Sequence, residues 1–207
     1  MHKGYQSMRI KLGCLGFICA AALLFGCSSH NLKHQDFDAL SQNERIALLE
    51  NIKNLKEYGK VALFISQPRF RISSDFMYDY EKDNSTLEII GPVGVTMAKI
   101  YINNLGEMTV LIDSKKYTHH EAEAILKKQF NLTLPADKLS RIIRGLNVGT
   151  PTYDEQGYLK SVTTGDDYII NYKSYDKFQY GYNLPKEIEI TKDNSRLLIK
   201  INRAILY

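Results

Sequence analysis

Tryptophan is absent from this 207-residue chain, and cysteine is nearly so. The three cysteines, Cys14, Cys19 and Cys27, all lie close to the N-terminus. No thiol is therefore available beyond Cys27 to form a disulfide, attack a substrate or ligate a metal. Chemistry that needs a thiolate is excluded from the rest of the chain.

The chain also lacks the short motifs of common enzymes. It contains no P-loop, no Gly-x-Ser-x-Gly nucleophile elbow and no His/Cys set with metal-ligand spacing. Its formal net charge is +4, but Lys3, Arg9 and Lys11 contribute three of these charges, and no acidic residue precedes Cys27. The remainder is almost neutral and has no basic stripe, so nothing favours nucleic-acid binding.

The N-terminus has the form of a bacterial lipoprotein signal peptide. A basic segment precedes Leu12–Phe25, an apolar run of about 14 residues that is short for a transmembrane helix. Gly26 and Cys27 complete a lipobox, and cleavage would leave Cys27 carrying a thioether-linked diacylglycerol and an N-acyl chain. The alternative is an ordinary signal peptide with an incidental cysteine. We predict a signal peptide over residues 1–26 and a lipidated polar tether over residues 27–35.

The lipobox also predicts a location. Three acyl chains exceed the two anchors that stable membrane attachment requires. Ser28 stands where an inner-membrane retention signal would usually place aspartate. We therefore expect a lipid-anchored protein of the outer membrane, on its periplasmic face.

Hydrophobic periodicity divides the remaining chain into helices and strands. A 3.6-residue period predicts a first helix over residues 36–55, ended by Tyr58 and Gly59. A two-residue period then predicts an antiparallel meander of about five strands over residues 60–113. Thr118 and Glu121 have capping-box spacing for a second helix, and Gly145 is the predicted cap of a third over residues 136–144. Further strands are predicted at residues 158–163, 168–172, 186–191 and 196–205.

The meander is organised around a hairpin over residues 85–101. Its two β-branched strands are joined by Gly91, Pro92, Val93 and Gly94, of which the glycines and the proline suit a turn. Val93 is unusual, because hairpin tips in soluble proteins are normally polar. Val93 either folds back onto the sheet or points outward to contact something apolar outside this chain.

Two polar clusters could suggest catalysis or metal binding. His119 and His120 stand beside Glu121 and Glu123, but adjacent histidines on a helix point in different directions, which favours a solvated first turn. The Asp166-Asp167 pair follows Gly165 and is typical of a turn.

The order of these features resembles the LolB family. The shared features are the lipobox, the first helix, the meander with Gly-Pro-Val-Gly, Tyr117 before a helix, Leu134-Pro135, Leu139, Gly145, and Leu184-Pro185 before the closing strands. The resemblance implies a mainly β, α+β fold over residues 36–207. Specifically, it implies an antiparallel, unclosed β-barrel of about eleven strands, lidded by about three helices around an apolar cavity.

The resemblance further implies a receptor, not an enzyme. LolB proteins accept lipoproteins from the periplasmic carrier LolA, hold their acyl chains and insert them into the outer membrane. The expected partners are therefore LolA, client lipoproteins and outer-membrane phospholipid, with no cofactor and with a monomeric state. The family's protruding loop carries a leucine important for membrane insertion, and Val93 occupies its position. This chain also lacks the tryptophans that family members usually place before Gly145 and near the C-terminus.

One-sided alternation in the strands and the apolar faces of the helices predict which residues line the cavity. These are Ile72, Phe76, Leu87, Ile89, Met97, Ile112, Ile142 and Ile143. Two other functions stay open: a structural or envelope-assembly lipoprotein whose sheet binds another protein, and, more remotely, a lipid-modifying enzyme.

Overall fold

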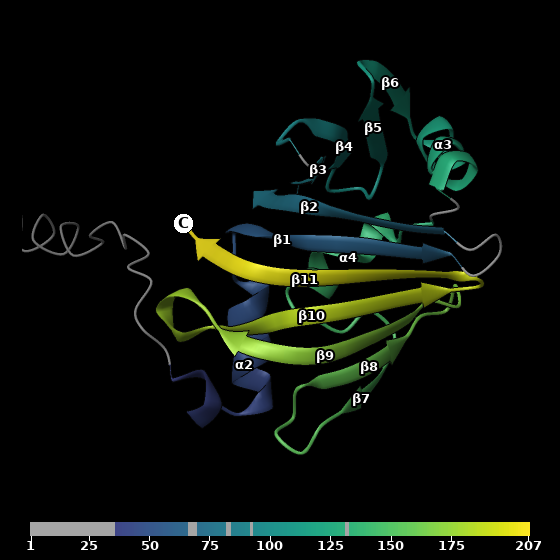
Figure 1. The fold of residues 1–207 in the computed structure, drawn as a ribbon. Coiled ribbons are helices and arrows are strands. Elements are labelled where there is room, and N and C mark those ends of the chain that lie inside the picture. Colours follow the sequence, from purple (N-terminus) through teal and green to yellow (C-terminus); the bar gives the residue numbers. More distant parts are fainter. Residues whose placement is uncertain (1–35, 66–69, 82–83, 92, 131–132) are drawn as a thin grey trace, which may run out of the picture. The chain divides into compact units, whose positions relative to one another are not determined.

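The computed structural model describes residues 36–65, 70–81, 84–91, 93–130 and 133–207, with backbone alone at residues 65, 70–72, 129 and 130. Residues 34–207 form one compact unit. In its described part, eleven strands form a single sheet in the order β6-β5-β4-β3-β2-β1-β11-β10-β9-β8-β7 (Figure 1). Every neighbouring pair is antiparallel, and β6 and β7 at the two edges do not pair, so the sheet is unclosed.

The first predicted helix is wrong at its C-terminal end. A short 3₁₀ helix, η1 (Phe37–Ala39), precedes α2 (Gln42–Glu50), and β1 begins at Asn54. Ser41 caps α2 in a capping box with Glu44. Leu55, predicted to be helical, instead pairs with Leu206 and Tyr80 on the two neighbouring strands. The position of Leu55 fits both the 3.6-residue period of the helix and the two-residue period of the strand. Its pairing with strands on both sides decides that it is extended.

The predicted meander is confirmed and is longer than expected. It comprises β1 (Asn54–Ile65), β2 (Phe70–Glu81), β3 (Asn84–Ile90), β4 (Thr96–Ile102) and β5 (Met108–Ile112). The edge strand β6 (Lys115–Thr118) follows and was not predicted. Thr118 therefore ends a strand instead of capping a helix, and α3 (His120–Phe130) begins two residues later.

The third helix closely follows the prediction. α4 spans Ala136–Ile143, Arg144 is its C-cap, and Gly145 follows with a positive φ of 73°. The Gly145 N–H donates to Ile142 O and the Leu146 N–H donates to Arg141 O, which is a Schellman motif. Glycine suits this position because other residues adopt positive φ at a cost.

The C-terminal strands complete the other half of the sheet. They are β7 (Thr150–Tyr153), β8 (Leu159–Thr163), β9 (Ile169–Lys177), β10 (Asn183–Lys192) and β11 (Ser195–Leu206), with the 3₁₀ turn η2 (Gln179–Gly181) before β10. Of these, β7 was not predicted. β11 pairs with β1 and so joins the end of the chain to the first meander.

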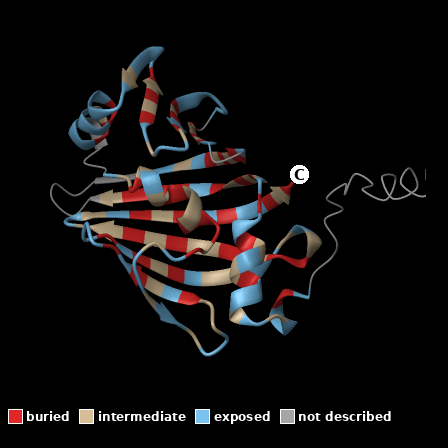
Figure 2. Ribbon diagram, turned by 180° about the vertical axis from the view of Figure 1, so that it is seen from behind, coloured by how far each residue is buried: buried red, intermediate tan, exposed pale blue. Residues whose placement is uncertain are grey.

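One face of the sheet carries the core. Buried and less buried residues alternate along the strands, and α2 and α4 lie across this face (Figure 2). α3 packs beside β5 and β6. This arrangement leaves apolar side chains of the sheet facing apolar side chains of the helices, and the main pocket lies between them.

Candidate functional site: an apolar pocket beneath two helices

A pocket of about 420 Å³ lies between one half of the sheet and the helices α3 and α4. Its volume is within the range of roughly 300–1,000 Å³ that is usual for small-ligand sites. All but three of its lining residues are apolar, the exceptions being Ser74, Thr96 and Asp113. A pocket of this composition offers dispersion contacts and the exclusion of water, with little to recognise a polar ligand.

Six of the eight predicted cavity residues line this pocket: Phe76, Leu87, Ile89, Met97, Ile112 and Ile143. They come from four strands and α4. Phe76 fits closely against β1 because Gly59 is its register partner there. A β-carbon at Gly59 would lie 2.9 Å from Phe76 Cε1 and 1.9 Å from the Lys200 carbonyl oxygen, so this position requires glycine.

Two of the predicted cavity residues are not placed in the pocket wall. Ile142 is fully buried, but it is not among the lining residues, and its carbonyl accepts a hydrogen bond of 3.2 Å from the Tyr172 hydroxyl. Adjacent positions on a helix differ by about 100° in direction, so Ile143 lines the pocket and Ile142 does not. The side chain of Ile72 lies outside the described residues.

Met97 lines the pocket while remaining 51 % exposed. The β3–β4 pairing explains this position. Ile89 pairs with Ala98 and Ile90 pairs with Thr96, so Met97 is the extra residue of a β-bulge. The bulge moves Met97 out of the regular alternation to the mouth of the pocket.

Most of the remaining lining residues were missed by sequence reasoning. The signal for Val61 and Leu63 was present, because both lie on the apolar face of a predicted strand. Leu126 of α3 and Leu139 of α4 belong to the helices that cover the pocket, and their apolar spacing gave their helical face but not what it covers. Leu134 lies in the connection before α4. The other missed apolar residues are Val95, Ala98, Ile100, Leu197 and Ile199, and the three polar lining residues were not predicted either.

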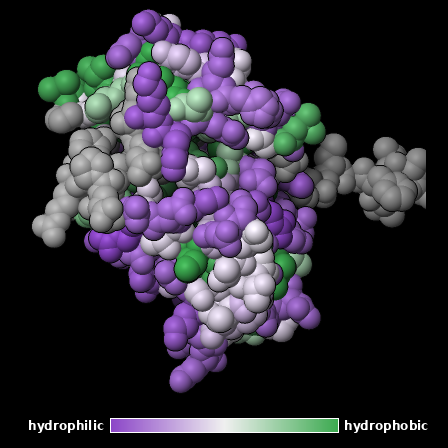
Figure 3. Space-filling model, turned by 90° about the vertical axis from the view of Figure 1, so that its right-hand side faces the viewer, coloured by the Kyte–Doolittle hydropathy of each residue, from purple (hydrophilic) through white to green (hydrophobic). Residues whose placement is uncertain are grey.

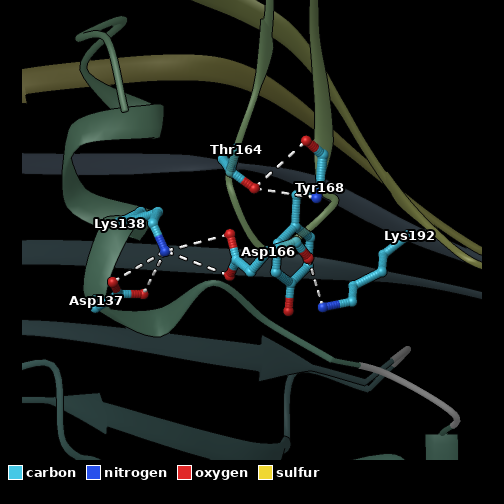
Figure 4. Close-up of polar contacts among 6 residues, drawn as sticks. All are labelled: Asp137, Lys138, Thr164, Asp166, Tyr168 and Lys192. Atoms are coloured by element: carbon cyan, nitrogen blue, oxygen red, sulfur yellow. Dashed lines mark hydrogen bonds and ion pairs between the residues drawn. The ribbon is translucent and has the colours of Figure 1, made fainter. Parts of the chain in front are cut away.

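The N-terminal end of α4 is held by a lysine between two carboxylates (Figure 4). Lys138 Nζ lies 3.1 Å from Asp137 Oδ2 and 3.3 Å from Asp166 Oδ2 in the β8–β9 turn. Burial lowers the pKa of Lys138, but hydrogen bonds and charges from the two aspartates outweigh it, so the pKa is raised overall. Lys192 Nζ donates to Asp166 O at 2.8 Å and lies over the Tyr168 ring, which links this turn to β10.

The C-terminal end of α4 is held by Arg144, which is only 5 % exposed. Its Nη1 donates to the carbonyls of Leu49 and Ile52 at 3.3 and 3.4 Å, and its Nε donates to Ser140 O at 3.1 Å. The guanidinium carbon lies 4.5 Å from the centre of the Tyr80 ring. Fixed at both ends, α4 presents Leu139 and Ile143 to the pocket.

An exposed aliphatic tip lies next to the pocket mouth. Val93 is 85 % exposed and Val95 is 62 % exposed, and Val95 also lines the pocket. The Gly94 N–H donates to Gly91 O at 2.9 Å, and Gly94 has a φ of 77°, so the tip closes as a tight turn. Of the two alternatives for Val93, the structure has the outward one. Pro92 and Cys27 lie outside the described residues.

On the side of the molecule drawn in Figure 3, hydrophilic side chains predominate, and several groups of hydrophobic side chains lie at the height of β3–β6 in Figure 1. No helix within the described ranges has the length and apolar character to cross a bilayer.

The histidine pair differs from its prediction in geometry. His119 precedes α3 with a φ of 48°, and its ring centre lies 4.2 Å from that of His120, so the two rings do not diverge as they would inside a helix. His120 Nδ1 lies 3.8 Å from Glu123 Oε2, and both side chains are largely exposed. Across the described part of the chain, no group of three or more His, Cys, Asp or Glu side chains is placed to hold a metal ion.

The fold is similar to that of a solved structure. A crystal structure of a LolA superfamily protein from Nitrosomonas europaea superposes with a TM-score of 0.52, covering 82 % of this chain and 94 % of that one at 9 % identity. The sequence then gives the family, because the family model described as "Outer membrane lipoprotein LolB" matches residues 57–203. The chain therefore belongs to the LolB family.

Individual LolB proteins align over most of the chain. The one from Cellvibrio japonicus is 26 % identical over 200 residues, covering 92 % of this chain and 95 % of its own. The one from Vibrio cholerae serotype O1 is 20 % identical over 197 residues, covering 91 % and 94 %. Both are named outer-membrane lipoprotein LolB, and the present chain is accordingly a lipid-anchored lipoprotein of the outer membrane that belongs to the Lol pathway.

Proposed function

We propose that this protein accepts lipoproteins from the periplasmic carrier LolA, holds their acyl chains in the apolar pocket and inserts them into the outer membrane. The observation that carries this proposal is the continuity between pocket and tip. Val95 and Met97 belong to the pocket wall and are also exposed, and Val93 continues the same aliphatic surface beyond the mouth.

The energetics of the cargo explain why such a surface would be needed. A triacylated cysteine carries on the order of 40 methylenes, and at ~0.8 kcal/mol each their exposure to water would cost roughly 30 kcal/mol. A lipoprotein cannot cross an aqueous space unaided at that cost. A receptor therefore has to offer apolar surface that continues from the carrier to the bilayer, and this transfer needs no nucleophile or metal.

The pocket and the anchor have separate tasks in this proposal. Acyl chains on Cys27 keep the protein at the membrane, while Phe76, Leu139, Ile143 and their neighbours bind the cargo. A mature form with Cys27→Ala should therefore still accept lipoprotein from LolA. The test incubates this form with LolA that carries a labelled lipoprotein and follows the label after the two proteins are separated.

The outcomes of this test distinguish the proposed function from its alternatives. Transfer of the label to the Cys27→Ala form supports the proposal. Failure to bind both carrier and cargo would mean that the tether is part of the binding site and that the proposal is wrong. Purification of a stable protein complex with an empty pocket would instead favour an envelope-assembly role.

A further inference from the structure

Two connections of the sheet lie at the same end of β4. Because β4 is antiparallel to both β3 and β5, the described tip residues 91 and 93–95 and the β5–β6 turn at residues 113–114 both lie beside its first residue, Thr96. Ala98 pairs with Ile112, and Ile112 pairs with Lys115. Lys115 and Lys116, both exposed, therefore begin β6 beside the mouth of the pocket.

The C-terminal half of α3 also lies at the pocket. α3 follows β6 in the chain and packs against β5 and β6. Leu126 of α3 and Ile112 of β5 line the pocket together, so this part of α3 lies beside it. Lys127 and Lys128 follow Leu126 directly and are exposed.

These four lysines, here called the mouth lysines, form no ion pair with an acidic side chain within the described residues. Of the acidic residues of α3, Glu121 lies in its first turn. Glu123 is one turn before Lys127, but its carboxylate lies 3.8 Å from His120 Nδ1. Asp113 is the acidic residue of the β5–β6 turn and cannot neutralise four cations. The helix dipole favours lysines at the end of α3, but it does not account for Lys115 and Lys116 on the strand.

We propose that the mouth lysines bind anionic phospholipid headgroups and thereby turn the pocket mouth and the aliphatic tip toward the bilayer. This inference rests on the proposed function, to which it adds the lipid class and the orientation. An aliphatic tip bordered by unpaired cations matches a bilayer surface, where apolar chains lie beneath a layer of phosphate groups. An acidic protein would match the lysines, but it would leave the exposed valines without a partner.

The test uses the mature Cys27→Ala protein, which carries no lipid anchor. Flotation would measure its binding to vesicles of phosphatidylethanolamine alone and of phosphatidylethanolamine with phosphatidylglycerol. Binding should be stronger to the anionic vesicles and should weaken as NaCl rises from about 50 to about 500 mM. Changing all four mouth lysines to glutamine should lower anionic-vesicle binding on the order of tenfold or more.

A matched variant controls for net charge. It changes four other exposed lysines to glutamine and should bind anionic vesicles nearly as well as the unaltered protein; these are Lys53, Lys60, Lys160 and Lys200. Equal loss in both variants would overturn the proposal, because the effect would then be one of overall charge. Binding that is indifferent to phosphatidylglycerol would overturn it as well.

Cargo acceptance from LolA, measured in parallel, separates this inference from the proposed function. Acceptance by the four-lysine variant should be unchanged, because the pocket is intact. If acceptance is lost while vesicle binding persists, the lysines contact an acidic surface of the carrier and the lipid assignment is wrong. If even the unaltered protein accepts no cargo yet prefers anionic vesicles, the proposed function fails and the lipid contact stands.

Discussion

Glu57 of β1 lies directly opposite Tyr78 of β2, and both side chains are fully buried. Neither carboxyl oxygen of Glu57 has a hydrogen-bond partner in the described part of the protein. Glu57 is on the same face of β1 as Val61 and Leu63, but it is two residues before Gly59, the register partner of Phe76, and it does not line the pocket. It is a buried acid that the proposed function does not use, and its effect should be on stability.

Burial raises the pKa of Glu57 well above its ordinary value of 4.5. The native protein therefore retains a proton that the unfolded chain releases, and the free energy of unfolding should fall as the pH rises from 4.5 toward the folded-state pKa. The expected slope is about 1.4 kcal/mol per pH unit. Glu57→Gln should remove this slope and make the protein more stable than wild type at pH 7.

Urea unfolding at several pH values between about 4 and 8 would measure the effect. Glu155→Gln, in an exposed turn, is the matched control and should leave the pH dependence unchanged. A Glu57→Gln protein with the wild-type slope would show that Glu57 is ionised in the native state. Cargo binding should be the same in both variants, because neither residue lines the pocket.

The buried arginine of α4 gives a second stability prediction. Arg144→Ala should lower the free energy of unfolding by about 2–3 kcal/mol, because charge-assisted hydrogen bonds to the carbonyls of Leu49, Ile52 and Ser140 are lost. Arg141→Ala is the control: its ion pair with Glu50 is half-exposed, and its loss should cost less than ~1 kcal/mol. Thermal or urea unfolding compares the two, and equal effects would contradict the role given to Arg144.

The two-residue period of the strands could be read from the sequence, but the edge strands could not. β6 and β7 are four residues long and have no buried position, so they carry no alternation of buried and exposed residues. The end of the first helix was misjudged for a different reason. Ile52 and Leu55 are buried and continue a helical spacing, yet Leu55 is held in a strand by pairs on both sides.

The pocket was only partly predictable, because a pattern gives the face of an element but not what that face covers. Phe76, Leu87 and Ile112 follow from alternation along single strands. Leu197 and Ile199 line the same pocket because β11 pairs with β1, a contact between opposite ends of the domain. The burial of Glu57 depends on the same long-range pairing, and its sequence neighbours Lys56 and Tyr58 gave no sign of it.

A filled pocket should bind acyl chains less well. Ala98 is small, lines the pocket and is 7 % exposed, so Ala98→Phe places a ring in the cavity. Because the pocket already offers room for the ring, the free energy of unfolding should change by less than about 2 kcal/mol. Affinity for a fluorescent fatty acid should fall roughly tenfold, since apolar contact area is lost to the ring.

Ala124→Phe, on the exposed surface of α3, is the matched control and should leave fatty-acid binding unchanged. Thermal unfolding of both variants would show that each is folded. Normal binding by a folded Ala98→Phe protein would mean that acyl chains are held elsewhere.

The aliphatic tip gives the most specific prediction. Val93 and Leu105 are both highly exposed aliphatic residues, at 85 % and 77 %, in turns at opposite ends of β4. Val93→Glu would place a charge where the proposed function needs an apolar contact with the bilayer, a larger cost than the loss of two methyl groups. Acceptance from LolA should persist, because the pocket is unchanged, while delivery into vesicles should fall on the order of tenfold or more.

Leu105→Glu makes the same chemical change at the other end of the strand and should deliver cargo normally. Val93→Leu should deliver at least as well as wild type, because it adds apolar area at the tip. Pull-down measures acceptance and vesicle flotation measures delivery, with thermal unfolding to show that all three variants are folded. Equal defects in Val93→Glu and Leu105→Glu would indicate a general effect of added negative charge. Normal delivery by a folded Val93→Glu protein would exclude the tip from insertion, because a buried contact with lipid chains cannot tolerate an unpaired carboxylate at that position.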